Sequence, residues 1–282
     1  MEEKKYKLTD ECITVCGRKL YRIEALKDFG NITKGQKGGF VESERNLSQK
    51  GNCWIGHNAK VYDNAKIFNN ARILHDAEIC DRAEICDNAI VCDNAIVYDK
   101  AIIFGSAQIY EESKIFDNAH IHGQARILGN AVVSDNAEIY DYAIINENAT
   151  ICDSATVYGH AEVSGHAGIF CNAEVYDITH VYENAKIYDN AEVFGNASVR
   201  SNAIIRGYAK VSNISDYIVF KNWWSSGRPF TWTRSNNMWS VGCFYGTGKE
   251  LIKKAYEDSK LSGKEYERVV KYVESILKDS RK

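Results

Sequence analysis

The chain has 282 residues, of which 26% are charged and 45% hydrophobic, and its formal net charge at pH 7 is −3. It has no apolar run long enough to span a membrane and no signal-peptide pattern after Met1, so we expect a cytoplasmic protein without a membrane partner. The nine cysteines are an odd number scattered along the chain, which argues against a disulfide framework and suits a reducing compartment.

Residues 1–54 do not repeat and predict a β-rich N-terminal cap. Short strands are predicted at 5–8, 12–15 and 20–23, with a turn at 16–19. A repeating structure follows, and an uncapped solenoid end would expose apolar side chains and unpaired strand edges. We therefore expect this segment to cover the first coil of that structure.

Residues 55–212 repeat with an uninterrupted period of six. Steps of six from Ile55 to Val211 meet 27 consecutive Ile or Val residues. The residue two positions before each one is nearly always Ala, and the exceptions are Cys53, Ser113 and Thr179. A helical stripe requires a period of 3.6, so this period indicates a short strand followed by a turn.

The turns of the repeat are mostly Asp-Asn or Gly-Asn, as at 63–64 and 129–130. These residues tolerate left-handed backbone conformations, which lets the chain change direction. Three hexads then form one triangular coil with Ile or Val and Ala inside, and about nine coils stack at roughly 4.8 Å spacing. The sequence predicts an all-β solenoid of parallel strands.

The repeat resembles the hexapeptide-repeat superfamily, and the resemblance implies a left-handed parallel β-helix. The segment GGFVESERNLSQKGNCWI at 38–55 is similar to the N-terminal segment of an uncharacterised group of bacterial and prophage members. Acyltransferase activity has been suggested for one enterobacterial member of that group. The segment WTRSNNMWSVGCFYGTG at 232–248 resembles a tail found in prophage-encoded proteins of Gram-positive hosts.

Residues 213–282 predict a C-terminal cap. Strands are predicted at 217–220, 230–233 and 238–244. Two helices follow, and capping boxes at Thr247–Glu250 and Ser262–Glu265 are predicted to open them. The second helix carries an apolar face formed by Tyr266, Val269, Val270, Val273 and Ile276/Leu277, which we expect to pack on the shaft or on a partner helix.

The charge is distributed unevenly along the chain. Residues 56–212 carry 22 acidic and 11 basic residues, whereas both flanking segments are mildly basic. Asp at the corners is first of all turn chemistry, and an acidic shaft makes nucleic acid an unlikely partner. Cys80, Cys86 and Cys92 are six residues apart on successive faces, so they cannot pair and act as small apolar fillers. No Cys-x-x-Cys is present, and we expect no metal.

The histidines are the candidates for catalysis. In acyltransferases of the superfamily, a histidine base works on acyl-CoA or acyl-carrier protein in a groove between neighbouring subunits. His120 and His122 flank Ile121 and should both point outward, so they are the candidate base or anion-binding pair. Against catalysis, no loop interrupts residues 55–212, whereas such enzymes usually carry a loop at the active site.

The residue after each core Ile or Val should face outward, and it is commonly aromatic, Leu or Cys. Residues 18 apart should stack on one face, which gives two aromatic columns. The first contains Phe68, Cys86, Phe104, His122, Tyr140, Tyr158, Tyr176 and Phe194. The second contains Tyr62, Cys80, Tyr98, Phe116, Ser134, Cys152, Phe170 and Tyr188. Either the columns only stabilise the coil, or they are buried in a homo-oligomer, which we expect to be a trimer joined through Phe68, Phe104, Tyr140, Tyr158, Tyr176 and Phe194.

Four of the five tryptophans lie between 223 and 239, interleaved with basic residues. Aromatic and arginine side chains can stack nucleobases and neutralise phosphate, although the same residues also suit the small core of a cap. The candidate ligand-binding residues are Trp223, Trp224, Arg228, Trp232, Arg234 and Trp239, with Lys221 beside them.

Three functions remain open from the sequence. The first is a non-catalytic oligomeric binding protein that acts on a host protein or sequesters a nucleotide-like ligand, and the prophage-like ends favour an anti-defence role. The second is an acyltransferase that uses acyl-CoA at the subunit groove, and no other cofactor is expected. The third is a structural spacer or virion component.

Overall fold

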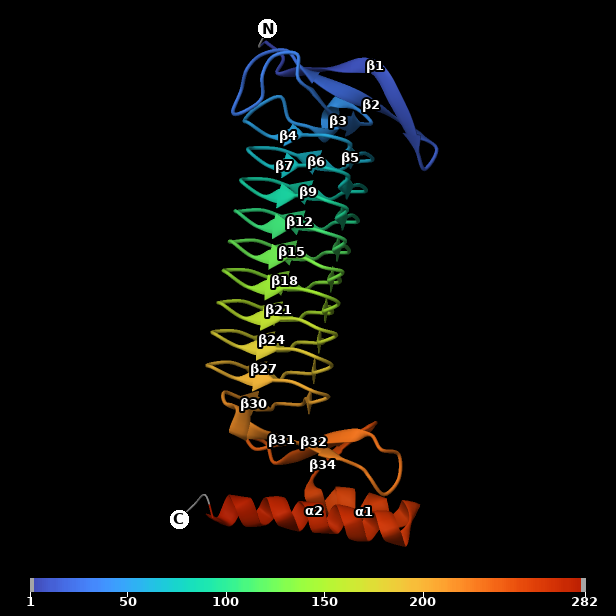
Figure 1. The fold of residues 1–282 in the computed structure, drawn as a ribbon, viewed down its shortest axis with the longest axis vertical. Helices are drawn as coiled ribbons and strands as arrows, with labels where there is room; N and C mark the ends of the chain where they lie inside the picture. The colour runs from blue at the N-terminus through green and yellow to red at the C-terminus, as the bar shows by residue number, and fades with distance from the viewer. Residues whose placement is uncertain (1–2, 280–282) are drawn as a thin grey trace.

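A computed structural model describes residues 3–279 as a long parallel β-solenoid with a cap at each end (Figure 1). This confirms the predicted all-β solenoid, its N-terminal β cap and its C-terminal cap of strands and two helices. The left-handed winding implied by the resemblance stays a prediction. None of the helices within residues 3–279 is long and apolar enough to cross a membrane.

The N-terminal cap extends one sheet of the shaft. It consists of β1 (Tyr6–Val15), β2 (Arg18–Ala25), β3 (Lys37–Val41) and the short 3-10 helix η1 (Glu44–Asn46). β1 and β2 are antiparallel, β2 and β3 are antiparallel, and β3 pairs in parallel with the shaft. The two strands predicted at 5–8 and 12–15 are wrong in one respect, because a register shift between Leu8 and Cys12 keeps them in a single strand.

Each coil of the shaft contributes one two-residue strand to each of three sheets. The first sheet contains, after the cap strands, β5 (Lys60–Val61), β8 (Glu78–Ile79), β11 (Ile96–Val97), β14 (Lys114–Ile115), β17 (Val132–Val133), β20 (Thr150–Ile151), β23 (Gly168–Ile169), β26 (Lys186–Ile187) and β29 (Ile204–Ile205). The second contains β4 (Trp54–Ile55), β7 (Arg72–Ile73), β10 (Ile90–Val91), β13 (Gln108–Ile109), β16 (Arg126–Ile127), β19 (Ile144–Ile145), β22 (Glu162–Val163), β25 (His180–Val181) and β28 (Ser198–Val199). The third contains β6 (Lys66–Ile67), β9 (Glu84–Ile85), β12 (Ile102–Ile103), β15 (His120–Ile121), β18 (Glu138–Ile139), β21 (Thr156–Val157), β24 (Glu174–Val175), β27 (Glu192–Val193) and β30 (Lys210–Val211).

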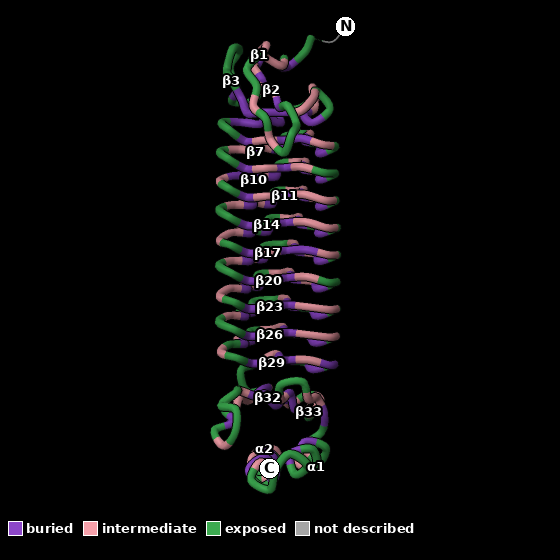
Figure 2. The backbone as a smooth tube through the Cα atoms, turned by 90° about the vertical axis from the view of Figure 1, so that its right-hand side faces the viewer, coloured by how far each residue is buried: buried purple, intermediate pink, exposed green. Residues whose placement is uncertain are grey.

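The core is a continuous column of Ile, Val and Ala along the axis of the shaft (Figure 2). Ile121, for example, has no exposed surface, whereas the turns between strands are exposed or partly buried. Ser113 and Thr179, which replace Ala, are also buried. Their hydroxyls donate to the carbonyl oxygens of Tyr110 (2.7 Å) and Tyr176 (3.0 Å), so neither polar group is unpaired in the core.

The corners follow the predicted turn chemistry. Asp81 and Asp99, at equivalent corners of successive coils, both have positive φ. The Asp81 carboxylate also accepts the backbone N–H of Asp99 (3.4 Å), and the same link recurs along this corner column. Asp is therefore used here both for left-handed backbone and to join successive coils.

The C-terminal cap consists of an antiparallel sheet and a helical pair. It contains β31 (Tyr217–Lys221), β32 (Pro229–Thr233), β33 (Met238–Val241), β34 (Phe244–Gly246), α1 (Gly248–Asp258) and α2 (Lys260–Asp279), preceded by the 3-10 helix η2 (Ile214–Asp216). The single strand predicted at 238–244 is wrong, because a turn at Gly242 (φ 56°) separates β33 from β34.

The helix starts are partly as predicted. Thr247 caps α1 and forms the predicted capping box with Glu250. The prediction that Ser262 opens the second helix is wrong, because α2 begins at Lys260 and the Ser259 hydroxyl accepts the Ser262 N–H (3.0 Å). On the predicted apolar face of α2, Tyr266, Val270 and Val273 are buried.

Side chains of the cap pair with the free backbone groups of the last coils. The N–H of Ile204 donates to Thr231 Oγ1 (2.9 Å), and the N–H of Lys210 donates to Ser235 Oγ (2.7 Å). Tyr217 accepts the N–H of Arg200 (3.2 Å) through its hydroxyl. The cap thus pairs sheet-edge groups that would otherwise be open to another strand.

Candidate functional site: the groove between the shaft and the C-terminal cap

The structure divides the predicted tryptophan and arginine cluster into buried and exposed members. Trp232 and Trp239 are 0% and 2% exposed and pack with Phe230 in the core of the cap. Trp232 Nε1 donates to Asn237 Oδ1 (2.9 Å), so its polar edge is also occupied. These two tryptophans hold the cap together, and their ring faces are not open to a ligand.

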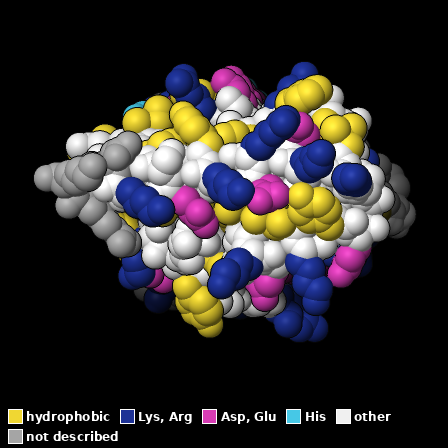
Figure 3. All heavy atoms as spheres, turned by 90° about the horizontal axis from the view of Figure 1, so that it is seen from below, with side chains coloured by type: hydrophobic (Ala, Val, Ile, Leu, Met, Phe, Trp, Pro, Cys, Tyr) yellow, Lys and Arg dark blue, Asp and Glu magenta, His cyan; other side chains and the backbone are white. Residues whose placement is uncertain are grey.

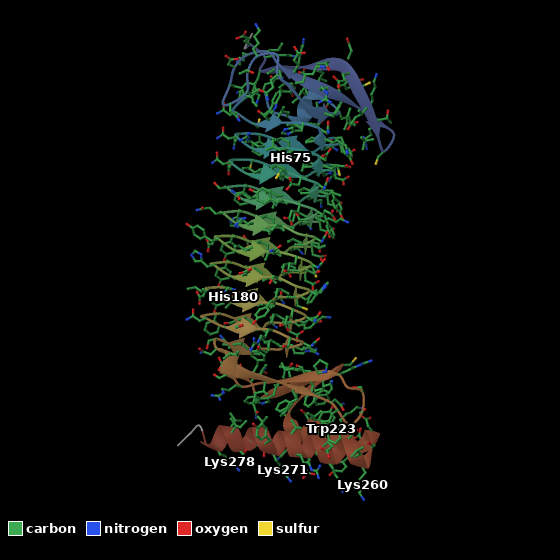
Figure 4. All side chains as sticks on the ribbon, viewed as in Figure 1. His75, His180, Trp223, Lys260, Lys271 and Lys278 are labelled. Carbon is green, nitrogen blue, oxygen red and sulfur yellow. The ribbon has the colours of Figure 1, made fainter. Side chains whose placement is uncertain are left out.

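The remaining tryptophans of the cluster lie on the segment that joins β31 to β32. Trp223 is 70% exposed and is labelled on the C-terminal cap in Figure 4. Trp224 is partly buried, with its ring centroid 5.9 Å from that of Trp223 and 4.9 Å from that of Tyr266. Trp223 therefore offers a free aromatic surface, while Trp224 anchors the segment to α2.

The predicted arginines also differ in their surroundings. Arg234 is partly buried, and its backbone N–H donates to the Asp216 carbonyl oxygen (2.7 Å). Arg228 is exposed and lines a groove at the junction of cap and shaft. Thus the six predicted residues do not form one surface, and Arg228 is the one that reaches a hollow.

Residues of both the cap and the last coils line this groove, which we call the junction groove. Its lining residues are Asn184, Lys186, Asn202, Ile204, Arg228, Pro229 and Gly242. Lys186 and Ile204 are directly paired on β26 and β29, and the asparagines lie 18 residues apart at consecutive corners. The groove therefore combines two cationic side chains and two amides with the apolar Ile204 and Pro229.

The cations of the junction groove are available to a ligand. Lys186 and Arg228 are exposed, and within residues 3–279 neither forms a salt bridge. Sequence reasoning identified Arg228 but missed Lys186, Asn184 and Asn202. The 18-residue period places these three near one another, but only the position of the cap shows which coil faces Arg228.

The end of the molecule beyond the junction groove is mixed in charge. Figure 3 shows Lys and Arg side chains interspersed with acidic and hydrophobic ones on the face seen from below. Lys271 and Glu267 on α2 are paired (2.7 Å), as are Arg268 and Glu265. The visible end face therefore has no continuous basic patch that would favour phosphate over other groups.

The candidate histidines differ in exposure. His120 is exposed, whereas His122 is partly buried between Phe104 and Tyr140, with ring centroids 4.6 Å and 5.0 Å away. His122 Nε2 lies 3.0 Å from Glu138 Oε1 on the next coil. The carboxylate fixes the orientation of the imidazole, and the stacking leaves only the ring edge open.

The first aromatic column stacks as the sequence predicts. Phe104, His122, Tyr140, Tyr158, Tyr176 and Phe194, which we call the aromatic ladder, have successive ring centroids 4.6–5.4 Å apart. Each ring face is covered by its neighbour, so the ladder presents ring edges and hydroxyls rather than platforms for a base. Burial raises the pKa of Tyr158 to about 12, with a further contribution from Glu174.

Apolar side chains at a neighbouring corner extend the surface of the aromatic ladder. Tyr142 is 49% exposed and Ile178 is 57% exposed, on the same coils as Tyr140 and Tyr176. His160 lies between them in the 18-residue column and stacks on Tyr142, with centroids 4.7 Å apart. An exposed apolar corner beside an aromatic column is typical of a protein contact surface.

Comparison of the chain with models of known protein families found no match, and comparison with curated protein sequences found none either. The functional argument therefore depends on the geometry of the junction groove, the aromatic ladder and the corners of the shaft.

Proposed function

We propose that this protein is a non-catalytic, homo-oligomeric binding protein that holds a small anionic, nucleotide-like ligand in the junction groove. The observation that carries the proposal is the pair of exposed, unbridged cations, Lys186 and Arg228, beside the apolar Ile204 and Pro229. A phosphate would accept charge-assisted hydrogen bonds from both cations, and each such bond contributes about 1.5–3 kcal/mol. Given the prophage-like ends, sequestration of such a ligand from a host defence system is the role we favour.

The groove chemistry favours a ligand with both a charged and a flat apolar part. Asn184 and Asn202 supply amide donors and acceptors, and Ile204 supplies apolar contact. Trp223 lies five residues before Arg228 on the same segment and is open to solvent. Stacking of a base on an aromatic ring contributes roughly 1–3 kcal/mol, so Trp223 can add affinity for a nucleotide over free phosphate.

Calorimetry with adenosine, AMP, ATP and inorganic phosphate tests this proposal. We expect the nucleotides to bind more tightly than adenosine, and the double variant Lys186→Ala/Arg228→Ala to weaken that binding about tenfold or more. Lys114→Ala is the matched control, because Lys114 occupies the same outward position on the first sheet, four coils away from Lys186. Equal binding by the double variant and the parent, or no binding of any probe, would contradict the proposal.

The second candidate is acyl transfer from acyl-CoA at a groove between subunits. The contact of His122 Nε2 with Glu138 favours it, because a carboxylate that orients a histidine is a common feature of general bases. Calorimetry with acetyl-CoA separates the two functions. Binding that is lost in His122→Gln and retained in the junction-groove double variant would favour acyl transfer. A chain that binds neither acetyl-CoA nor the nucleotides would favour the spacer or virion role.

A further inference from the structure

Three side chains of different chemistry meet at one corner of the shaft, close to the N-terminal cap. They are His75, Cys92 and Asp93, and their ligand atoms all lie within 4.8 Å of one another. Figure 4 shows His75 in the upper part of the shaft, far from the C-terminal cap that carries Trp223. This corner is therefore separate from the junction groove.

We propose that this corner binds one divalent transition-metal ion, with His75 Nδ1, Cys92 Sγ and Asp93 Oδ1 as ligands, and that Zn²⁺ fits it best. Zn²⁺ binds imidazole nitrogen, thiolate sulfur and carboxylate oxygen, usually four ligands in a tetrahedron. The proposal revises our expectation of no metal, which depended on the lack of Cys-x-x-Cys. That motif is one way to place ligands together, and stacking of coils is another.

The hexad repeat places these residues together. His75 and Asp93 occupy equivalent turn positions 18 residues apart, and the pairing of Ile73 with Val91 stacks their coils directly. Both residues have positive φ, 58° and 62°, so both corners turn in the same way. Cys92 immediately precedes Asp93 and is buried, so its thiol forms the floor of the corner.

Hydrogen bonds from neighbouring coils orient the proposed ligands. Asp93 Oδ2 accepts the backbone N–H of Glu111 (3.2 Å), which leaves Oδ1 directed at His75 Nδ1 (2.9 Å). The N–H of His75 donates to His57 Nδ1 (3.3 Å), and the two imidazole rings lie 4.9 Å apart. Partners of this kind fix ligand orientation at metal sites, and their loss typically weakens metal binding 10- to 100-fold, an order-of-magnitude range.

Metal binding at this corner has a simple proton balance. The Cys92 S–H bond breaks, a metal–sulfur bond forms, and the proton passes to water. His75 carries its proton on Nε2 and donates the Nδ1 lone pair to the metal, while Asp93 binds as carboxylate. The side chains of His75 and Asp93 are 49% and 39% exposed, so water can occupy the fourth position.

A second corner of the shaft provides an internal control. Asp135, Cys152 and Asp153 have the same arrangement further along the repeat, with aspartate in the place of His75. That corner lacks the imidazole nitrogen and therefore has weaker affinity for Zn²⁺ and Co²⁺. Substitution of Cys152 changes an equivalent thiol without changing the proposed site.

The test is titration of the reduced, full-length chain, without a histidine tag, with Co²⁺ followed by Zn²⁺. We expect one equivalent of Co²⁺ to produce a thiolate-to-cobalt charge-transfer absorption, which Zn²⁺ then removes. Cys92→Ser should abolish this absorption, His75→Ala should weaken Co²⁺ binding about tenfold or more, and Cys152→Ser should bind as the parent does. Thermal melting of each variant without metal checks that it is folded.

Two results would overturn the proposal. The first is a parent chain that gives no thiolate-to-cobalt absorption. The second is an absorption that survives in folded Cys92→Ser or disappears in folded Cys152→Ser, because the thiolate would then belong to another site.

Discussion

The imidazole ring of His122 lies parallel to the phenol ring of Tyr140, with centroids 5.0 Å apart and planes within 2° of each other. The spacing follows from the stacking of β15 on β18, because each of these residues directly follows its strand on adjacent coils. Aromatic pairs of this kind contribute about 0.5–1.5 kcal/mol beyond their buried area. The aromatic ladder therefore stabilises the shaft in addition to presenting a surface.

The aromatic ladder makes stability fall at high pH. Burial raises the pKa of Tyr158 to about 12, above the value of about 10 for an unfolded tyrosine. The folded state holds its proton more tightly, so this stabilisation is complete below about pH 10 and is lost as the pH rises towards 12. We expect the melting temperature to fall over this range, and to fall less in Tyr158→Phe. Tyr208→Phe is the control, since Tyr208 is 77% exposed.

The aromatic ladder and its neighbouring corner predict self-association. We expect light scattering to give the mass of a trimer, and Tyr158→Arg to lower that mass because a charge would be buried in the contact. Tyr110→Arg is the control, because Tyr110 occupies the same outward position on the second sheet. A monomer at micromolar concentration, or equal loss of mass in both variants, would contradict an interface on the third sheet.

The interior of the shaft tolerates no charge. Ile121 is fully buried among Ile and Ala side chains, with no polar side chain to pair with a carboxylate. Ile121→Asp should prevent folding, because an unpaired buried charge costs several kcal/mol. His120→Asp changes the neighbouring outward residue and should fold. Soluble yield and far-ultraviolet circular dichroism measure both, and a folded, soluble Ile121→Asp would contradict the stacked core.

The N-terminal cap depends on a glycine where β3 meets the first coil. A Cβ on Gly39 would overlap the carbonyl oxygen of Ala59 and lie 2.6 Å from Ile55 Cγ2. Gly39→Ala should therefore destabilise the chain by roughly 1–3 kcal/mol, since the backbone cannot move away without breaking the sheet. In Gly56→Ala the nearest atom is the flexible end of Leu74 at 3.1 Å, so thermal melting should show a smaller loss. Equal melting temperatures would contradict this close approach.

Much of the fold could be predicted because the repeat is local. Each hexad contains its own strand and turn, so the alternation of buried Ile121 with outward His120 and His122 follows from the sequence pattern alone. The same period places Phe104, His122 and Tyr140 in one column, since residues 18 apart occupy equivalent positions on successive coils. The capping box of α1 at Thr247 is also a local signal.

The candidate sites depended on contacts that no local pattern records. The buried positions of Trp232 and Trp239 come from the packing of β32 and β33 against α1 and α2. Arg228 lies near Lys186 because the cap covers the last coils at one orientation, which side chains such as Thr231 hold by pairing with the shaft.

The sequence by itself determined the period, the buried column and the aromatic ladder, because these depend only on alternation along a strand and stacking every 18 residues. Only the tertiary structure decided which cations share the junction groove and how the side chains of His75 and Asp93 meet beside Cys92. The physical reason is that such sites depend on side-chain rotamers and on how the cap covers the last coils, and neither is repeated in the hexad.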